Sequence, residues 1–454
     1  MTEDRIKRLK TGAGERRWKL ATAGFKTGAR VAAQLSTDWL LPPSARESRR
    51  KQMLSREAQS LAATLGELKG SLVKVGQMMA VYGEHVLPAE VTAALHTLEH
   101  QTQPMAWPVM QQVLRDALGD ACDAWVIDPE PIGAASLAQV HKALLPDGTV
   151  VALKIQYPGI ADAMDSDLNE MARLIRWSGL VTGRDDFEPW LESLRELLHR
   201  EVDYALEADS TERFRRRLQS DARFVVPQVL PQYSSQRVLC ATFEAGFDVL
   251  DARVQALSQP RRNQLGKAFL ELFLREVFEW GELQTDPNFG NYRIRIGKHA
   301  DEDQLVLLDF GAAKTYDAHY LTGLQTMMRG AYRCDPDAVR RGAMALGMIN
   351  ENLPESVQHD FTALCAAVIE PLCPQYFDVP AEALNKKGHY RWRESRLPRR
   401  LSKQAAKAAL SVHFHVPPGD FVFLSRKLVG VYTFIAALGA EFDGGPLMEQ
   451  WLAP

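Results

Sequence analysis

The stretch Gln284-Thr-Asp-Pro-Asn-Phe-Gly-Asn291, followed by the triplet Asp309-Phe-Gly311, decides the fold that we expect for this chain. Within it, Asp286 and Asn291 have the D-x-x-x-x-N spacing that places a carboxylate near a reacting group and an amide on a metal ion. Asp309 follows Asn291 by 18 residues and ends the apolar run 305–308. A carboxylate at the end of a buried strand is well placed to bind Mg²⁺. The two motifs therefore predict a metal site built from Asn291 and Asp309, beside the acid Asp286.

A loop of small residues upstream is typical of a phosphate-binding turn. Gly133-Ala-Ala-Ser-Leu-Ala-Gln-Val140 follows the frame G-x-G-x-x-G-x-V, with alanine in place of its second and third glycines. Fourteen residues beyond Val140, across a Pro-Asp-Gly turn, Lys154 lies on the returning strand of a predicted hairpin. A lysine on a rigid strand can reach the α- and β-phosphates of ATP. The predicted phosphate contacts are Gly133, Ala134, Ala135, Ser136, Ala138, Val140 and Lys154.

Together these motifs give a loop, a lysine, an acid, an amide and a metal carboxylate in the order found in protein kinases. ATP and Mg²⁺ are the cofactors that such a set predicts. Adenine is expected to bind at the apolar segment Val238–Gly246, which leads from one lobe to the next. Its contacts are expected to fall within the three residues Thr242, Phe243 and Glu244. Backbone groups make such contacts, so the sequence names no single residue there.

Four motifs resemble the atypical kinases of the UbiB and AarF type, also called aarF-domain-containing kinases. They are the alanine-rich loop, Lys74-Val-Gly-Gln77, Glu201-Val-Asp-Tyr-Ala-Leu-Glu-Ala208, and Gln284-Thr-Asp-Pro-Asn288 in place of a His-Arg-Asp loop. The resemblance covers roughly residues 50 to 440. It implies an α+β, protein-kinase-like two-lobed fold with an N-terminal helical extension that carries the KxGQ motif.

The resemblance also implies roles for individual residues. The helix with Lys74 and Gln77 would lie across the active site and contact Glu201 and Asp203, which would occlude a protein substrate. The resemblance names Glu207 as the acidic partner of Lys154, whereas spacing alone leaves Asp203 and Glu207 equally eligible, because they stand four apart on one helical face.

The family is linked to coenzyme Q (ubiquinone) metabolism, with ATP hydrolysis or small-molecule phosphorylation expected rather than protein phosphorylation. No Ala-Pro-Glu follows Asp309, so the usual platform for a peptide is missing. The alternative is an ATP-binding pseudokinase that serves as a scaffold or regulator of a biosynthetic complex. Expected partners are the nucleotide, an anionic lipid or a quinone precursor, and proteins of such a complex.

The expected organisation has four parts. Residues 1–47 form a basic segment that is flexible or membrane-associated, and 48–125 the helical KxGQ extension, with an apolar seam from Leu54 to Met79. Residues 126–243 form the small lobe with a helical insertion, and 244–454 the helical lobe with the catalytic loop and DFG. A second hairpin is expected over 291–308. Helices are expected around 163–177, 187–219, 260–280, 317–348 and 357–370.

Composition and charge indicate where the protein works and which partners it is expected to bind. The net charge of -3 over 454 residues gives no reason to expect binding to nucleic acid. Five scattered cysteines without CxxC spacing favour a reducing compartment. The start of the chain lacks an apolar signal region, and the run Leu428–Ala440 predicts a buried helix that is too short to span a bilayer. We expect a cytoplasmic protein, peripheral at the inner membrane face, although relatives of the UbiB type often carry C-terminal spans.

Rival motifs favour other functions. His96-Thr-Leu-Glu-His100 matches the H-x-x-E-H zinc-peptidase pattern but has no recognisable third ligand, and Ser71-Leu-Val-Lys74 resembles an S-x-x-K pair whose other motifs are in the wrong order. Arginines around Trp392, over 391–400, suit either a solvated loop or a surface for anionic lipid headgroups or an acidic partner. The basic stretch 16–30 with Trp18 and Phe25 could form an interfacial helix.

Overall fold

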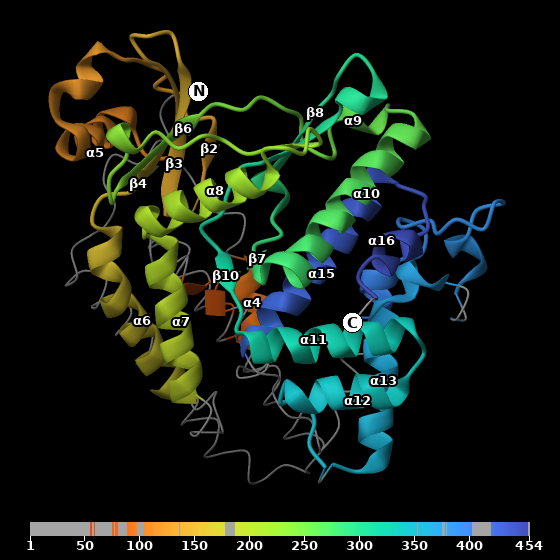
Figure 1. The fold of residues 1–454 in the computed structure, drawn as a ribbon. Helices are drawn as coiled ribbons and strands as arrows, with labels where there is room; N and C mark the ends of the chain where they lie inside the picture. The colour runs from red at the N-terminus through yellow and green to blue at the C-terminus, as the bar shows by residue number, and fades with distance from the viewer. Residues whose placement is uncertain are drawn as a thin grey trace. The chain divides into compact units, whose positions relative to one another are not determined.

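A computed structural model provides the structure of the chain. It describes residues 55–56, 59, 75–76, 78–79, 89–97, 104–135, 137–177, 187–351, 353–374, 377, 379–401 and 419–452. The chain divides into two compact units. The first unit runs up to Ala208 and includes Gln228–Phe243, and the second contains Asp209–Pro227 and the chain from Glu244 onward. Both units mix helices with sheets, which confirms the α+β class (Figure 1).

An antiparallel sheet organises the first unit. Its strands are β1 (Val126–Ile127), β3 (Ala138–Leu144), β4 (Val150–Gln156) and β6 (Val238–Thr242), in that spatial order, and β2 (Gly133–Ala134) also pairs with β3. The predicted hairpin is confirmed, with Val140 opposite Lys154. Its turn is closed by Thr149, whose carbonyl accepts the N–H of Leu145, and by Gly148, whose φ of 87° suits glycine.

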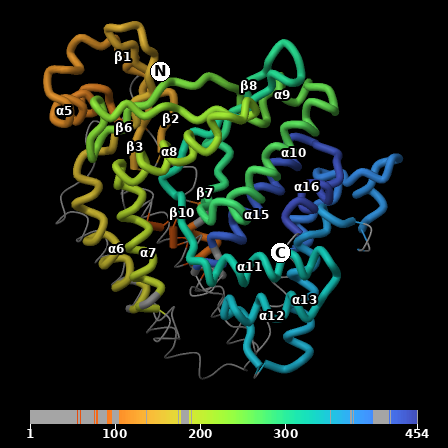
Figure 2. The backbone as a smooth tube through the Cα atoms, viewed as in Figure 1, coloured from red at the N-terminus to blue at the C-terminus, as the bar shows by residue number. Residues whose placement is uncertain are grey.

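Helices supply the rest of the first unit's core. They are α4 (Ala89–His96), α5 (Trp107–Leu118), α6 (Ile160–Trp177), α7 (Phe187–Glu201) and the start of α8 (Tyr204–Leu218), with a 3-10 segment at Gly119–Ala124. α6 and α7 lie side by side (Figures 1 and 2). Leu168 of α6 and Leu198 of α7 are buried in the same core as Leu153 and Ile155 of β4. The described residues of the seam at 54–79 are helical, and Val75 and Met79 are buried.

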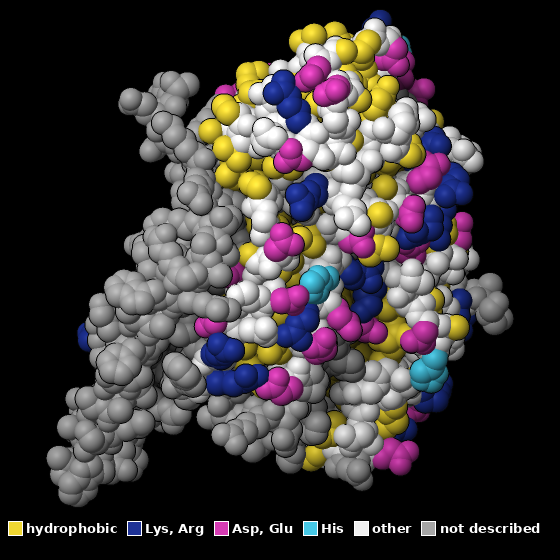
Figure 3. All heavy atoms as spheres, turned by 90° about the vertical axis from the view of Figure 1, so that its left-hand side faces the viewer, with side chains coloured by type: hydrophobic (Ala, Val, Ile, Leu, Met, Phe, Trp, Pro, Cys, Tyr) yellow, Lys and Arg dark blue, Asp and Glu magenta, His cyan; other side chains and the backbone are white. Residues whose placement is uncertain are grey.

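The outer surfaces of α6 and α7 carry charges of both signs. Arg195 of α7 forms ion pairs with Asp165 of α6 and with Glu192 of its own helix. On the face that Figure 3 shows, acidic and basic side chains are likewise interspersed rather than gathered by sign. Such a surface keeps the helices solvated while their apolar sides pack inward.

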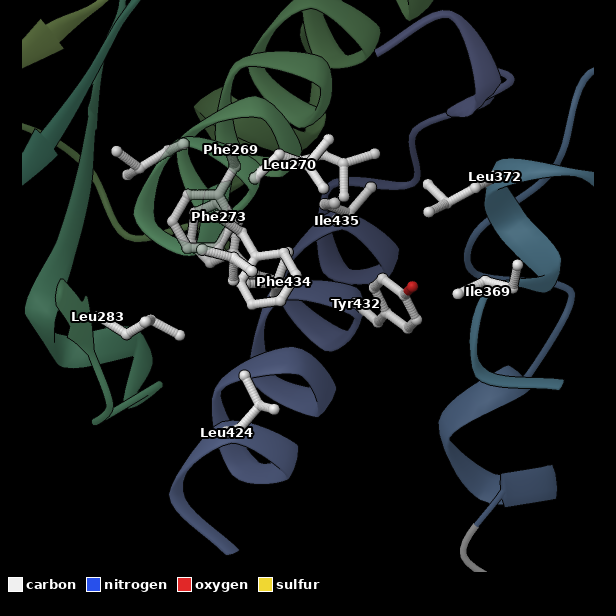
Figure 4. Packing of buried hydrophobic residues seen from close by; sticks show 14 of the residues in the cluster. Phe269, Leu270, Phe273, Leu283, Ile369, Leu372, Leu424, Tyr432, Phe434 and Ile435 are labelled. Atoms are coloured by element: carbon white, nitrogen blue, oxygen red, sulfur yellow. The ribbon is translucent and has the colours of Figure 1, made fainter. Parts of the chain in front are cut away.

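Two long helices form the centre of the second unit. α10 (Gln259–Arg275) packs along α15 (Gly419–Leu438), and the rings of Phe269 and Phe434 approach to 4.4 Å between centroids (Figure 4). α15 contains most of the run 428–440 that was predicted as a buried helix, but it begins nine residues earlier than that run. α10 continues into a π-helical turn, Glu276–Trp280, and Gly281, with a φ of 62°, ends it. No helix among the described residues is long and apolar enough to cross a membrane.

Two small sheets stand beside these helices. β8 (Tyr292–Arg295) and β9 (Gln304–Leu307) form the predicted second hairpin, and β5 (Phe224–Val225) pairs with β9 in parallel. β7 (Glu282–Gln284) pairs with β10 (Ala313–Thr315). The pairing of β5 with β9 explains why 209–227 belongs to the second unit, whereas the sequence placed it in the first lobe.

The remaining helices of the second unit are shorter than α10 and α15. They are α9 (Ala252–Gln255), α11 (Ala318–Tyr332), α12 (Pro336–Ala345), α13 (Glu355–Val368) and α16 (Gly445–Glu449), with 3-10 segments at Phe289–Asn291, Ala300–Glu302, Glu370–Leu372 and Ala381–Ala383. A further 3-10 segment, Pro231–Tyr233, lies in the first unit.

Two long predicted helices were wrong in their extent. The helix over 187–219 is divided into α7 and α8, and the helix over 317–348 into α11 and α12. In the second case Cys334 adopts a positive φ of 55° and Asp335 then caps α12 by accepting the N–H of Ala338. An aspartate that caps a new helix ends the previous one, because its own backbone is not helical.

Candidate active site

Lys154 of β4 is held by a buried carboxylate of the first unit. Its Nζ lies 2.7 Å from Oε1 and 2.8 Å from Oε2 of Glu207, on the first turn of α8. The Glu207 side chain is 3% exposed and that of Lys154 22%. The ring of Tyr204 lies 5.4 Å from the same ammonium group. The pairing of Lys154 with Glu207, which the resemblance implied, is therefore confirmed.

Asp203, the other candidate for the acidic partner of Lys154, caps a helix instead. Its Oδ1 accepts the N–H groups of Ala205 and Leu206, each at 3.1 Å, which caps the start of α8. The predicted contacts of Glu201 and Asp203 with Lys74 and Gln77 stay predictions, because Lys74 and Gln77 lie outside the described residues.

The small-residue loop forms a tight turn on β2 and β3. Gly133 and Ala134 pair with Val140 and Gln139, and the N–H of Ala135 donates to the carbonyl of Ala138 at 2.8 Å. A Cβ on Gly133 would have no heavy atom within 4 Å. Ala138, by contrast, is buried with Tyr204 and Leu239, so its methyl group belongs to the core. Ser136 lies outside the described residues.

Some polar groups of the segment predicted to bind adenine already form hydrogen bonds with neighbouring strands and residues. Thr242 pairs with Val151, and its hydroxyl accepts the N–H of Gln228 at 3.0 Å. The N–H of Phe243 donates to the carbonyl of Val150 at 3.0 Å. In the second unit, Glu244 forms an ion pair of 2.6 Å with Arg295. The N–H groups of both Thr242 and Phe243 are therefore engaged within the first unit, and the binding of adenine at this segment stays a prediction.

In the second unit, both carboxylate oxygens of Asp286 have a donor. Nδ2 of Asn291 donates to Oδ2 at 2.8 Å, and Nη2 of Arg426, from α15, donates to Oδ1 at 3.0 Å. The loop between them is closed by Asn288, whose side chain accepts the N–H of Gly290 and whose carbonyl accepts that of Asn291. Sequence reasoning missed Arg426, which is 140 residues from Asp286 along the chain.

Asp309 follows β9 on a segment that is tied to the Asp286 loop. The carbonyl of Asp309 accepts the side-chain amide of Gln284 at 3.3 Å, and the hydroxyl of Thr285 donates to the carbonyl of Ala312 at 2.7 Å. The N–H of Leu308 donates to the carbonyl of Asn291 at 2.9 Å. These bonds bring the loop with Asp286 and Asn291 beside the segment with Asp309.

Hydrogen bonds between buried polar groups help to hold the loop of Asp286 in place. The hydroxyl of Tyr292 donates to Gln284 Oε1 at 3.1 Å and to the carbonyl of Asp286 at 3.4 Å. Burial, together with the negative charges of Glu276, Asp286 and Asp309, raises the pKa of Tyr292 well above its ordinary value. Its hydroxyl therefore stays protonated and keeps donating to the loop throughout the physiological pH range.

Asn291 and Asp309 of the second unit carry oxygen atoms of the kind that bind a magnesium ion. Asn291 uses its amide nitrogen on Asp286, so its amide oxygen is the atom left to ligate a cation. Oδ1 of Asp309 accepts the N–H of Gly311 at 2.9 Å, which fixes the orientation of that carboxylate. Carboxylate and amide oxygens are hard ligands of the kind that Mg²⁺ prefers.

Part of the basic segment 391–400 packs within the second unit. Trp392 is 2% exposed, and its indole N–H donates to the carbonyl of Phe442. Arg391 forms ion pairs with Glu394 and Glu441, and Arg400 with Glu370. Arg393, Arg396 and Arg399 are exposed, so these arginines lie at the surface that local composition predicted, whereas Trp392 belongs to the core. The basic stretch 16–30, and Glu99 and His100 of the zinc-like motif, lie outside the described residues.

The chain is similar to several known proteins. Residues 97–342, more than half of the chain, match the ABC1 atypical kinase-like domain. Atypical kinase COQ8B, mitochondrial, of Rattus norvegicus is 30% identical over 396 residues, which cover 87% of this chain and 71% of that protein. Atypical kinase coq-8, mitochondrial, of Caenorhabditis elegans is 29% identical over 87% of this chain, which spans about half the length of that relative.

Among solved structures, the complex of Rv3197 with erythromycin from Mycobacterium tuberculosis has a similar fold. Its TM-score is 0.57 at 23% identity, and the alignment covers 90% of this chain and 100% of the other.

Proposed function

Because this chain belongs to the ABC1 atypical kinase-like family, with the kinase-like α+β fold of that family, we propose that it binds Mg²⁺-ATP and acts as an ATP-dependent phosphotransferase or ATPase. The observation that carries the proposal lies in the second unit. Gln284, Thr285 and Leu308 hold the loop with Asp286 and Asn291 against the segment with Asp309. The carboxylate and the amide of one loop thus come from a segment adjacent to the one that carries the second carboxylate, which supports the set of groups that phosphoryl transfer requires.

Each residue has a role in this proposal. Asn291 and Asp309 hold the metal, which when bound neutralises charge on the phosphates. Lys154 binds phosphate oxygens, and Glu207 holds the Lys154 side chain in place. Asp286 orients the attacking hydroxyl or water, and the two donors on its oxygens fix the direction of its remaining lone pairs. Positioning and electrostatic stabilisation supply most of the catalysis in this chemistry, so Asp286 needs no unusual basicity.

The acceptor that we propose is a small molecule, or water, rather than a protein. The chain has no Ala-Pro-Glu after Asp309, and the KxGQ segment is expected to occlude a peptide. The relatives are named COQ8 or coq-8, and the family is linked to ubiquinone. We therefore place the activity in coenzyme Q or isoprenoid-lipid metabolism, with a phenolic quinone precursor as the acceptor class.

Phosphate release by the purified protein tests the proposal. It is measured with Mg²⁺-ATP, with and without a phenolic quinone precursor, for the natural chain and for Asp286→Asn. We expect turnover that depends on Mg²⁺ and falls at least about a hundredfold in Asp286→Asn. A protein that binds ATP but shows no turnover dependent on Asp286 is the pseudokinase scaffold instead.

We also propose that the protein works at a membrane surface in a reducing compartment, attached through its basic N-terminal segment. Sedimentation with vesicles that contain an anionic lipid such as cardiolipin tests this proposal. Binding should weaken at high salt, because attraction between basic side chains and lipid headgroups is screened. Equal recovery with neutral and anionic vesicles would contradict it.

A further inference from the structure

Helix α15 contacts the loop of Asp286 through residues that are close together on the helix. Nη2 of Arg426 donates to Oδ1 of Asp286 at 3.0 Å. One helical turn later, Gly430 packs against Pro287, the residue that follows Asp286. Because positions four apart share a face of a helix, both contacts come from the same side of α15. This side of the helix therefore fits the catalytic loop through charge as well as through shape.

The absence of a side chain at Gly430 is required for this fit. A Cβ built on Gly430 would stand 1.9 Å from Cβ and 2.7 Å from Cγ of Pro287. Real carbon atoms do not approach so closely, and a proline ring cannot rotate away. The backbone of α15 thus lies directly against the loop, which keeps the Arg426 side chain within reach of Asp286.

A buried ion pair fixes the position of α15 along its axis. Nζ of Lys427 lies 2.9 Å from Oε2 and 3.2 Å from Oε1 of Glu276, and both side chains are almost fully buried, at 2% and 1% exposure. Sliding or rotating α15 by one residue would separate these charges inside the unit, which is very costly in a medium of low polarity. Glu276 lies in the π-helical turn that ends α10. Arg426 is therefore presented to the loop by a rigid support.

We infer that Arg426 is a positioning residue for Asp286, and this inference rests on the function proposed above. Asn291 fixes one carboxylate oxygen of Asp286, and Arg426 fixes the other. With a donor on each oxygen, the plane of the carboxylate is set, and so is the direction in which it can accept a proton or orient water. An arginine suits this task because its guanidinium is always charged and planar.

The test is a double-mutant cycle with steady-state phosphate release from Mg²⁺-ATP as its readout. The variants are Arg426→Gln, Arg426→Lys, Asp286→Asn and the double variant Arg426→Gln/Asp286→Asn. We expect Arg426→Gln to lower kcat about tenfold to a hundredfold, the range for a lost hydrogen bond between charged groups, while KM for ATP changes less than about twofold. Arg426→Lys, which keeps the charge but not the planar fork, should recover part of the loss. In the double variant, Arg426→Gln should cause no fall in kcat beyond the fall that Asp286→Asn causes alone.

The matched control is Arg340→Gln. Arg340 forms an ion pair with Asp337 on α12, in the same unit, and both side chains are well exposed. This variant should keep the kcat of the natural chain. Urea unfolding of each variant shows whether the fold persists, and Arg426→Lys keeps the test informative if Arg426→Gln folds poorly.

The outcomes separate two kinds of failure. If Asp286→Asn is impaired while Arg426→Gln matches Arg340→Gln, Arg426 has no positioning role, and the proposed function stands. If Arg426→Gln lowers kcat by the same factor with Asp or Asn at 286, Arg426 acts by another route, and the inference is again overturned. If the natural chain shows no turnover that depends on Asp286, the proposed function and the inference fail together.

Discussion

At the scale of single residues, the ion pair of Lys154 and Glu207 joins stability to function. Glu207 is almost fully buried, and a carboxylate is removed from water at a cost that its partner must offset. Both of its oxygens lie within 2.8 Å of the Lys154 ammonium group, so the compensation is direct. The same contact holds the lysine side chain in one orientation on β4, where a phosphate could reach it.

Replacing the lysine alone should therefore destabilise the first unit. We expect Lys154→Met to lower the free energy of unfolding by about 3 kcal/mol, the lower end of the range for one partner of a buried pair, because Lys154 is partly exposed. Lys154→Met/Glu207→Gln should recover most of this loss, since no carboxylate is then left inside. Urea unfolding at neutral pH measures both. A double variant less stable than the single one would show that the charge of Glu207 does not cause the loss.

The ion pairs of Glu282 with Arg213 and Arg217 predict that the free energy of unfolding depends on pH. Burial by itself raises the pKa of Glu282, but hydrogen bonds and charges from Arg213 and Arg217 outweigh burial, so the pKa lies below its ordinary value. A carboxyl with a lowered pKa in the folded state binds fewer protons there than in the unfolded state. Its contribution is therefore complete above the ordinary pKa of about 4.3 and is lost as pH falls through the lowered value.

The measurement is unfolding of the natural chain and of Glu282→Gln between neutral pH and about pH 3, a window that spans the ordinary carboxyl pKa. The difference in their free energies of unfolding should shrink as the pH falls. Glu355→Gln, at an exposed position on α13, is the control and should follow the natural chain. A constant difference for Glu282→Gln across the whole range would contradict the assignment.

Residue types at short spacing predicted part of this site and missed the rest. Lys154, Asp286, Asn291 and Asp309 stand in motifs whose members are close in sequence, so their spacing can be read directly. Asp203 and Glu207 were equivalent by spacing, and the structure distinguishes them because Glu207 pairs with Lys154 whereas Asp203 caps α8. Arg426 reaches Asp286 from 140 residues away, and no local pattern marks such a contact.

At the scale of elements, α15 and the Asp286 loop depend on close backbone approach. Gly430→Ala would push a methyl group into Pro287. We expect a loss of about 1–3 kcal/mol in the free energy of unfolding, as for other overpacked sites, and a fall in turnover because the loop must move. Thr433→Ala, at an exposed position on the same helix, is the control.

Urea unfolding and phosphate release are measured on both variants. A Gly430→Ala protein as stable and as active as Thr433→Ala would mean that α15 and the loop separate without cost, which the contact between Gly430 and Pro287 excludes.

Elements with local turn chemistry were easier to predict than elements that end by capping. The hairpin with Gly148 and the hairpin over 291–308 were predicted, because alternation and turn residues mark both strands. The long helices over 187–219 and 317–348 were not divided in the prediction, although Asp203 and Asp335 carry the capping signal. Apolar periodicity continued across each break and concealed it.

At the scale of the whole molecule, the motifs predicted a kinase-like chain, and one segment that the prediction put in the small lobe is grouped by its contacts with the second compact unit. Residues 209–227 belong to the second unit because Phe224 of β5 pairs with Leu305 of β9, and Phe214 packs on Phe310, with 4.6 Å between ring centroids. Such long-range contacts carry no signal in the sequence of the segment itself. The order of the motifs does carry a signal, because it places every catalytic role along the chain before any contact is known.

In the function proposed above, Asn291 and Asp309 hold the metal of a bound Mg²⁺-ATP. The most direct measurement is the rate of phosphate release as a function of Mg²⁺ concentration, for the natural chain and for Asp309→Asn. We predict that the natural chain saturates with Mg²⁺ and that Asp309→Asn is slower by about a thousandfold or more, because a ligand of the charge-neutralising ion is lost. An Asp309→Asn protein that turns over ATP at the natural rate, with the same dependence on Mg²⁺, would contradict the account.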